Sequence, residues 1–499
     1  MRLFFVSLSC ALSLLPACQK PADASAPPPV TVVAPPTERA SGVEASHQFY
    51  GVYVSGQKAG FAEEWVRPLP SGVEMETRVQ LTLTRLGQAM TLKLSDRVRY
   101  GDLPAGPLVE FETVEDLGAG GKTVRTGRAV EGGFDVTISA GGAAASTKRI
   151  ATPKEHAGDV IPALLLARLR KGPIEQWQFD RSTLEDIRIE TRIEGEREAR
   201  VSGVPTTIVT VVGKDTKRGL TLGSSLTASG RTLEMTVGPG FKLVLEDEAV
   251  AKDPNVAAPD LYKLALVPVD KPLGDPATVT ALDVRLQGLS PDAAVADNRQ
   301  TREGEEVKIR RTPCEALAVS SLPAATRARA LEVSPFIDHD QAPLRAFLAG
   351  HAAGADLPQR LSAAVHRALR YSLATAPMSA TAILASGQGD CTEYSRLLVA
   401  LLRAAGYPAR EVSGMAYSGD GEKGFAFHAW AEVFIDEAPC APDDPACRGS
   451  ERKGRWCPLD PTWNQLTPDA THIALSRDDP TPIIGLLGGV KAEVLRVER

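Results

Sequence analysis

The sequence predicts an α+β protein in which a β-rich N-terminal domain precedes a C-terminal domain of helices and strands. Residues 46 to about 250 alternate apolar and polar side chains between glycine-rich turns, which is the pattern of half-buried strands. From residue 336 the apolar residues recur at helical spacing instead. A chain of 499 residues is also too long for one ordinary core, so we expect more than one domain.

The N-terminus is predicted to be a lipoprotein signal peptide, residues 1–18. MRLFFVSLSCALSLLPAC has a basic residue at Arg2, an apolar core, and a small residue before Cys18. Its end resembles a bacterial lipobox, which implies that Cys18 is lipidated and becomes the first mature residue. Cleavage by ordinary signal peptidase near Ala17 is the alternative. The lipobox and Gln19 behind it imply the periplasmic face of a bacterial membrane, with the outer membrane favoured.

The rest of the chain divides into four segments by composition and period. Residues 19–45 are rich in Pro, Ala and Ser and are predicted to be a flexible tether. Residues 46–260 form the β-rich domain, interrupted by one helical segment, GDVIPALLLARLRKGP. Residues 261–335 carry a few further strand patterns and are predicted to be a β connector. Residues 336–499 form the C-terminal domain.

The composition excludes some classes of protein. Hydrophobic residues make up 43% and charged residues 24% of the chain, both in the globular range. The 56 basic and 62 acidic residues give a net charge of −6, and no basic patch interleaved with aromatics supports nucleic-acid binding. No apolar run of about 18 residues follows the N-terminus, so we expect membrane contact through the lipid alone. The sequence does not indicate an oligomeric state.

Export would leave five cysteines in an oxidising compartment: Cys314, Cys391, Cys440, Cys447 and Cys457. Cys440 and Cys447 lie in a polar, proline-rich loop, EAPCAPDDPACRGSERKG, and are predicted to form a short disulfide ring. Cys457 is an alternative partner, because connectivity does not follow from sequence. A zinc site is less favoured, since these cysteines have no Cys-x-x-Cys spacing.

One cysteine stands where a helix is predicted to begin, in GQGDCTEYSRLLVALLRAAGYPARE. Asp390 is a good N-cap and Glu393 follows three residues later, which is a capping-box arrangement. Gly406 and Pro408 end the helix. Cys391 is therefore at the first helical position, where the helix dipole and the unpaired amides favour a thiolate and an oxyanion site. A small buried residue is the alternative interpretation of this cysteine.

Two later stretches supply partners for a nucleophilic cysteine. GFAFHAWAEVFID has strand periodicity and places His428 on the same face as Trp430, where a general base could be held. RWCPLDPTWNQ ends a short strand at Asp460, whose carboxylate could orient the imidazole and stabilise its charged form. The chain order is therefore Cys391, His428, Asp460.

The blocks GQGDCTEYSRLLVALLRAAGYPAR, FHAWAEVFI and WCPLDPTWN, in this order, resemble the three blocks of the transglutaminase-like, papain-related cysteine fold. The resemblance covers roughly residues 336 to 475. It implies that Cys391 is the nucleophile, His428 the base and Asp460 the residue that orients the base. TAILASG and DATHIAL resemble the flanks of these blocks, and His472 in the second flank is expected to be a packed or surface histidine.

The resemblance implies an exported, lipid-anchored enzyme that cleaves amide bonds of a peptide or protein substrate in the cell envelope through a thioester. A peptidase or amidase is favoured over a crosslinking acyltransferase, although the sequence does not show which acceptor reaches the thioester. No cofactor and no metal are expected, and no EF-hand-like loop supports calcium binding. The alternative is a non-enzymatic envelope-binding or scaffold protein of the same fold, which would not need a Cys–His–Asp set.

Overall fold

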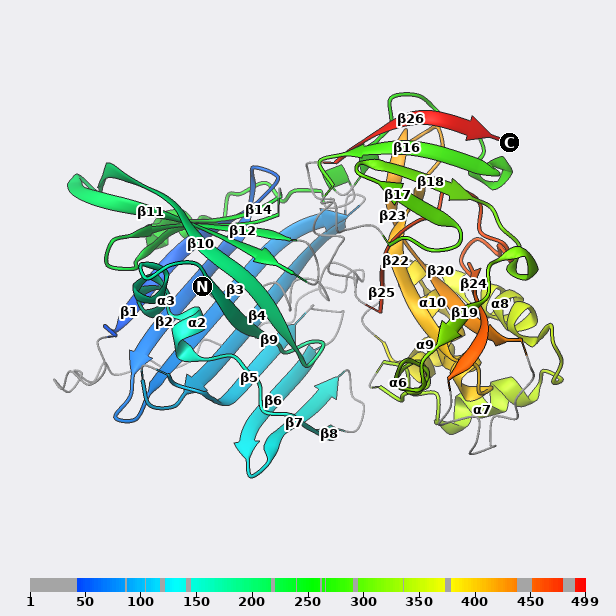
Figure 1. Ribbon diagram of the computed structural model, residues 1–499, viewed down its shortest axis with the longest axis horizontal. Coiled ribbons are helices and arrows are strands. Elements are labelled where there is room, and N and C mark those ends of the chain that lie inside the picture. The colour runs from blue at the N-terminus through cyan, green and yellow to red at the C-terminus, as the bar shows by residue number, and fades with distance from the viewer. Residues whose placement is uncertain are drawn as a thin grey trace.

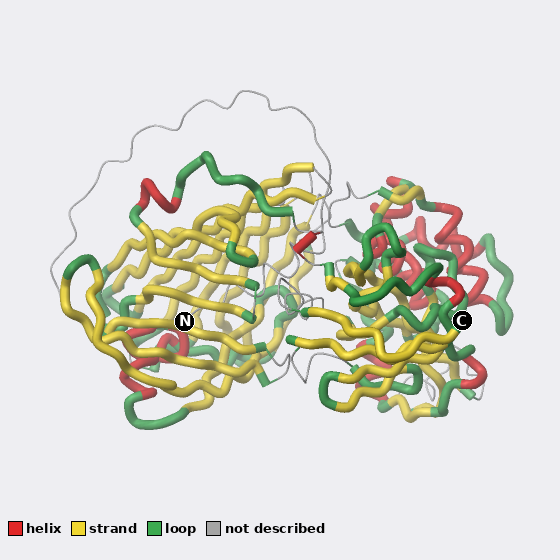
Figure 2. The backbone as a smooth tube through the Cα atoms, turned by 90° about the horizontal axis from the view of Figure 1, so that it is seen from above, coloured by secondary structure: helices red, strands yellow, loops and turns green. Residues whose placement is uncertain are grey.

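The computed structural model describes residues 43–499 except 86–87, 104, 117–121, 141–144, 217–219, 239, 261–262, 265, 290–294, 335, 373–377, 438–450 and 479–489. It confirms the predicted fold class, because a large β-sheet formed by the N-terminal half lies beside a smaller part of helices and sheets (Figures 1 and 2). None of the helices in these described residues is long and apolar enough to cross a membrane. The predicted signal peptide and tether, residues 1–18 and most of 19–45, lie outside the described residues.

The N-terminal half forms one antiparallel sheet of fourteen described strands, in the order β8-β7-β6-β5-β4-β3-β2-β1-β14-β13-β12-β11-β10-β9. The strands are β1 (Ser46–Val54), β2 (Gln57–Pro68), β3 (Val73–Arg85), β4 (Gln88–Tyr100), β5 (Leu108–Asp116), β6 (Lys122–Val130), β7 (Gly133–Ala140), β8 (Ser146–Ile150), β9 (Ile174–Asp180), β10 (Glu185–Val201), β11 (Val204–Asp215), β12 (Thr221–Thr227), β13 (Thr232–Val237) and β14 (Phe241–Glu246). Two meanders are thus joined where β1 pairs with β14.

This sheet curls around its own core. The helices α2 (Ala157–Val160) and α3 (Pro162–Leu169) connect β8 to β9, at the place where the sequence predicts a helix, and α3 buries three leucines among strand residues. The ring of Phe179 on edge strand β9 lies 5.9 Å from that of Phe111 on β5. Residues near the two ends of the strand order therefore share one apolar cluster, which is the packing that a strongly twisted sheet allows.

The C-terminal half contains two antiparallel sheets with helices packed beside them (Figure 1). One sheet has the order β19-β24-β23-β22-β25, with β15 also paired to β23, and the other has the order β17-β18-β16-β26. The strands are β15 (Val267–Pro268), β16 (Ala281–Gln287), β17 (Gln300–Glu303), β18 (Glu306–Arg310), β19 (Ser320–Leu322), β22 (Ala409–Tyr417), β23 (Gly424–Asp436), β24 (Arg452–Leu459), β25 (Ile473–Arg477) and β26 (Lys491–Glu498). The short pair β20 (Arg370–Tyr371) and β21 (Gln388–Gly389) is parallel.

The strands within residues 261–335 do not form a separate connector. Strand β15 pairs with β23, β19 pairs with β24, and β16 pairs with β26. These partners all lie after residue 336. The segment therefore supplies β17, β18 and β16 to one C-terminal sheet, and the edge strand β19 and the strand β15 to the other. Sequence periodicity predicted the strands but could not predict their partners, because pairing is decided by hydrogen bonds between distant segments.

The described helices of this half are α6 (Ala324–Arg329), α7 (Ala342–Ala349), α8 (Leu357–Ala368), α9 (Ala380–Ser386) and α10 (Cys391–Ala404), with short 3₁₀ turns at Pro276–Thr278 and Cys314–Ala316. The short helix α4 (Glu248–Ala251) packs on β1 and β2 of the N-terminal sheet instead. The apolar stripe of α10 is fully buried against α8, α9 and the strands β22 and β23. Helix α10 is therefore the central helix of the C-terminal core, and its first residue is Cys391.

Candidate active site

Cys391 is held at the capped start of α10. The side chain of Asp390 accepts hydrogen bonds from the backbone of Thr392, at 2.8 Å, and of Glu393, while Glu393 accepts the N–H of Asp390 at 3.0 Å. This confirms the predicted capping box. The backbone N–H groups of Thr392 and Glu393 already donate to Asp390, so they cannot bind an oxyanion. The sequence had predicted that the amides of this turn are unpaired. Cys391 is 4% exposed, and among the described residues it is the cysteine that forms no disulfide.

The carboxyl group of Glu393 is unusual for a helix cap. Burial, and then the negative charge of Asp390, raise the pKa of Glu393 to about 8. At neutral pH the protonated form of Glu393 is therefore favoured. In this state Glu393 still accepts the N–H of Asp390 and adds no second negative charge to the capping box.

His428 and Asp460 are brought together by the pairing of two strands. Strand β23 carries His428, and β24 leads directly into Asp460. The strands are antiparallel, with Ala431 opposite Leu459, so the next step along the ladder brings Asp460 level with Trp430, two residues from His428. The Nε2 atom of His428 lies 2.9 Å from Oδ2 of Asp460, and both residues are buried.

Asp460 receives four N–H groups. The backbone amides of Thr462 and Trp463 donate to Oδ1 at 2.8 and 3.2 Å, and the Nε2 atoms of His428 and His472 lie 2.9 and 3.2 Å from Oδ2. Burial alone would raise the pKa of Asp460, but the charges and hydrogen bonds of the two histidines hold it well below its usual range. Asp460 is thus an ionised carboxylate in a fixed orientation.

Two tryptophans enclose the imidazole of His428. The ring of Trp463 stacks on it at a centroid distance of 4.3 Å and an angle of 16°. Trp430, from the same strand as His428, lies at 6.2 Å and is itself buried. Trp463 remains 38% exposed, so it separates the His428 ring from solvent on one side.

Sequence reasoning missed two members of this cluster, Asp469 and His472. The sequence predicted that His472 is a packed or surface histidine; it is 1% exposed and shares Oδ2 of Asp460 with His428. A signal was present in the sequence, because Asp460-Pro-Thr462 repeats as Asp469-Ala-Thr471. In each repeat the aspartate accepts the N–H of the threonine two residues later, at 2.8 Å.

Among the described residues, one group could hold a metal ion by the type and spacing of its side chains. Ligand atoms of His428, Asp460 and His472 all lie within 4.8 Å of one another. These atoms, however, already form hydrogen bonds, since both histidines share one oxygen of Asp460. The cluster is therefore fully explained as a hydrogen-bond network.

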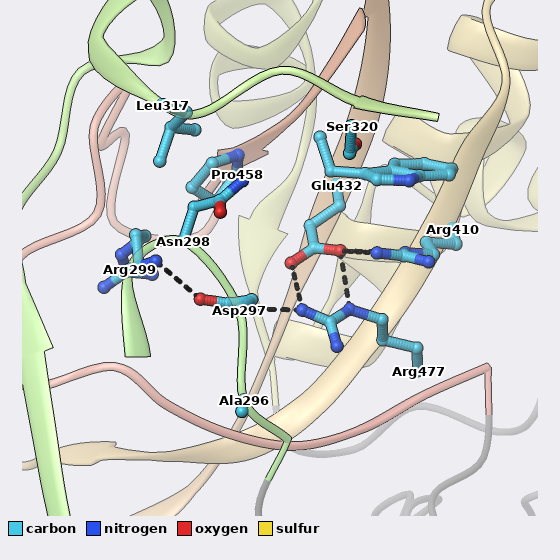
Figure 3. A pocket seen from close by; sticks show the side chains of 11 residues that line it. Ala296, Asp297, Asn298, Arg299, Leu317, Ser320, Arg410, Glu432, Pro458 and Arg477 are labelled. Carbon is cyan, nitrogen blue, oxygen red and sulfur yellow. Dashed lines mark hydrogen bonds and ion pairs between the residues drawn. The ribbon is translucent and has the colours of Figure 1, made fainter. Parts of the chain in front are cut away.

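A small cavity of about 270 Å³ lies beside this network, on the same face of β23 as His428. Figure 3 shows the carboxylate of Glu432 between Arg410 and Arg477, with Asp297 on the other side of Arg477. Burial would raise the pKa of Glu432, but the two guanidinium groups lower it to about 2. This ion-pair cluster links β23, the strand of His428, to β22 and β25.

One disulfide joins Cys314 to Cys457. The suggestion that Cys457 pairs with a loop cysteine is therefore wrong, because its sulfur is already bonded across two segments that are distant in sequence. Cys440 and Cys447, the predicted ring, lie outside the described residues, and so does the lipidation candidate Cys18.

Comparison with known proteins agrees with this geometry. Residues 344–461 match the model of the transglutaminase-like superfamily, and the matched range contains Cys391, His428 and Asp460. The C-terminal half therefore carries a transglutaminase-like domain. Asp469 and His472 lie beyond the matched residues.

The solved structures that match resemble this chain only distantly. A β-barrel-like protein of a domain of unknown function from Brucella abortus is 11% identical, with a TM-score of 0.32, over 41% of this chain and 96% of its own. A protein from Cytophaga hutchinsonii named "Putative Cysteine Protease" is 14% identical, with a TM-score of 0.28, over 44% of this chain and 92% of its own. No curated protein matches the sequence.

Proposed function

We propose that this chain is an exported, lipid-anchored cysteine peptidase or amidase that uses Cys391, His428 and Asp460. The observation that carries the proposal is the buried His428–Asp460 pair, in which the imidazole faces an ionised carboxylate at 2.9 Å. Cys391 begins the helix that packs against the strand of His428. A nucleophile, a base and an orienting carboxylate thus belong to adjoining elements of one core.

The orientation of the imidazole assigns the proton path. Since Nε2 of His428 donates to Asp460, Nδ1 is the atom that accepts the proton of the Cys391 thiol. The thiolate attacks the carbonyl carbon of the amide, and the protonated His428 then gives its proton to the leaving amine. The thioester on Cys391 is hydrolysed when His428 removes a proton from the attacking water, which releases the acid and regenerates the thiol.

Hydrolysis is proposed ahead of acyl transfer to an amine. Hydrolysis requires only water at the thioester, whereas transfer also requires a site that holds the amine close to Cys391. The substrate class proposed is a peptide or protein of the cell envelope.

The location of the enzyme is part of the proposal. Lipidation of Cys18 would anchor the chain at the periplasmic face of a bacterial membrane, with the outer membrane favoured. The disulfide between Cys314 and Cys457 supports export, because such bonds persist in oxidising compartments. Incorporation of an alkyne-labelled fatty acid into the wild-type chain, and its loss in Cys18→Ala, would test this; equal labelling would contradict it.

The catalytic proposal is tested by the rate at which iodoacetamide alkylates Cys391 between pH 4 and 10. An ordinary thiol is only about 0.3% thiolate at pH 6. If Cys391 is activated, its alkylation rate at pH 6 should be at least about ten-fold higher than the rate of an ordinary thiol at that pH. Peptide mapping would follow the modified cysteine, with Cys391→Ala as the blank. His428→Ala should remove the fast reaction at pH 6, while His351→Ala, at the end of α7, should leave it intact.

The same protein would then be incubated with peptides that carry or lack a primary amine, and the products would be identified by mass spectrometry. Cleaved peptides that depend on Cys391 and His428 support the peptidase proposal. The enzyme proposal would be contradicted if Cys391 reacts as an ordinary thiol and its alkylation rate is unchanged in His428→Ala. That result would favour the alternative, an envelope-binding or scaffold protein.

A further inference from the structure

His472 lies between two carboxylates and is fully buried. Its Nε2 atom is 3.2 Å from Oδ2 of Asp460, and its Nδ1 atom is 3.3 Å from Oδ1 of Asp469. The side chains of all three residues are 0% exposed. Both nitrogens of one imidazole therefore face carboxylate oxygens in the interior of the protein.

Neither carboxylate has a proton to give to His472. Asp460 already accepts two backbone amides and His428. Oδ1 of Asp469 accepts hydrogen bonds from the backbone N–H and the hydroxyl of Thr471, at 2.8 and 2.6 Å. Oδ2 of Asp469 accepts one from the side-chain amide Nε2 of Gln465, at 2.7 Å. Ionised carboxylates only accept hydrogen bonds, so both nitrogens of His472 must donate, and an imidazole that donates twice carries a proton on each nitrogen.

We propose that His472 is a permanently protonated positioning residue of the Cys391–His428–Asp460 site, which holds Asp460 in place and competes with His428 for the same carboxylate oxygen. Its effect on catalysis rests on the proposed function. Its charge does not, because the charge follows from the hydrogen-bond partners alone.

The surroundings of His472 fit a buried cation. The rings of Trp430 and Trp463 meet it edge to face, at 5.3 and 5.2 Å. The charged and titratable groups that face it are Asp460 and Asp469, which attract it, and His428, whose ring lies at 5.4 Å. Burial would lower the pKa of His472, but the hydrogen bonds and charges of the two aspartates raise it above its ordinary value.

Arg299 extends the network on the far side of Asp469. Its Nη2 atom donates to the backbone carbonyl of Asp469 at 3.0 Å, and the side chain is largely buried. Two cations, His472 and Arg299, thus accompany the two buried carboxylates Asp460 and Asp469. The charge balance of the cluster depends on His472 being protonated.

A second cation on Oδ2 of Asp460 has a definite consequence for His428. When His428 takes the proton of Cys391, two imidazolium rings lie 5.4 Å apart and share one oxygen. His472 therefore prevents Asp460 from stabilising the charged form of His428 too strongly, which would trap the site and slow the transfer of the proton to the leaving amine. The positive charge of His472 also favours the thiolate of Cys391.

The charge is tested directly by nitrogen-15 NMR of histidine-labelled, deuterated protein, with His472 assigned from the loss of its signals in His472→Gln. We expect both ring nitrogens of His472 to keep the shifts of a doubly protonated imidazole from pH 5 to pH 9. A neutral His472 at pH 7.5 would overturn the proposal. This measurement uses the wild-type chain, so it does not depend on whether a variant folds.

The effect on the site is tested by the pH profile of Cys391 alkylation. In His472→Gln, a neutral residue replaces a cation, so the charged form of His428 should gain stability and the thiolate of Cys391 should lose it. Both limbs of the alkylation profile should then move up by about one pH unit. The matched control is His351→Gln, whose histidine bonds to the carbonyl of Phe347 at the end of α7 and should leave the profile unchanged.

These outcomes separate the two proposals. If wild-type Cys391 titrates as an ordinary thiol, the proposed function fails, while NMR still decides the charge of His472. If wild-type Cys391 is activated and a folded His472→Gln variant keeps both limbs in place, the positioning role of His472 is contradicted and the proposed function stands. Circular dichroism and the urea midpoint establish whether the variant is folded.

Discussion

Replacing Cys314 and Cys457 with alanine removes the covalent link between the turn before β19 and the strand β24. This link closes a loop in which the two cysteines are 143 residues apart, and that loop contains α6 to α10 and Cys391. Cys457 lies three residues before Asp460, so the bond also anchors the strand that leads to the candidate site. The variant therefore measures how much the disulfide contributes to the stability of the C-terminal half.

The expected loss follows from the length of the loop. For a loop of about 143 residues, the chain-entropy expression gives about 17 cal/mol/K, or about 5 kcal/mol at 25 °C. A typical domain is stable by only about 5–15 kcal/mol, so this loss is a large fraction of the whole. We expect the free energy of unfolding of the double variant to fall by about 5 kcal/mol, and its C-terminal half to be partly unfolded at 37 °C.

The assay is urea unfolding followed by tryptophan fluorescence, with and without a reducing agent. Reduction of the wild-type chain breaks the bond but keeps both sulfur atoms, so the reduced wild type is the matched control for packing lost in the double variant. In the double variant the reductant can break only the predicted Cys440–Cys447 ring, so the response of this variant is subtracted from that of the wild type. A wild-type midpoint that is the same in both conditions would refute the reasoning, as would peptide mapping that links Cys457 to Cys440 or Cys447.

Two further substitutions test the buried acids. In Glu432→Gln the guanidinium group of Arg410 loses the carboxylate that pairs with it, while Arg477 keeps Asp297, so the variant should lose about 3 kcal/mol at pH 7. Because the pKa of Glu432 falls from 4.5 to about 2 on folding, wild-type stability should be present above pH 4.5 and decrease by about 3 kcal/mol as the pH falls to 2, a decrease that the variant lacks. Urea unfolding at several pH values measures both the loss of stability at pH 7 and the decrease at low pH. A Glu432→Gln variant that is as stable as the wild type at pH 7 would contradict the expected loss. Glu393→Gln should show the opposite dependence: folding raises the pKa of Glu393 from 4.5 to about 8, so wild-type stability is full below pH 4.5 and declines as the pH rises to 8 by about 1 kcal/mol per pH unit. The glutamine keeps the capping acceptor without the charge, so the variant should equal the wild type at pH 4.5 and exceed it at pH 8.5; identical curves would show that Glu393 is ionised in the folded protein.

Local features of the site were predictable from the sequence. The start of α10 at Cys391 depends on Asp390 and Glu393, which lie within three residues of it, and the structure confirms this capping box. The alternation along β23 placed His428 and Trp430 on one face, and both lie in the buried cluster around Asp460. The catalytic roles of these residues stay predictions until the alkylation experiment is done.

Other features had no local signal that decided them. His472 follows Asp460 by twelve residues in a segment without helical or strand periodicity, so its place on Oδ2 of Asp460 depends on how the segment folds back. Cys314 and Cys457 meet only because β19 pairs with β24. The curling of the N-terminal sheet likewise depends on Phe179 of β9 reaching Phe111 of β5.

The sequence by itself determined that α10 begins at Cys391, that the N-terminal half is built of strands, and which three segments carry a cysteine, a histidine and an aspartate. These properties depend on backbone groups and side chains within a few residues of one another. Only the tertiary structure decided that two histidines share one carboxylate, that Cys314 bonds to Cys457, and that the strands of residues 261–335 complete the C-terminal sheets. Those outcomes depend on the order in which distant strands pair, and no local pattern encodes that order.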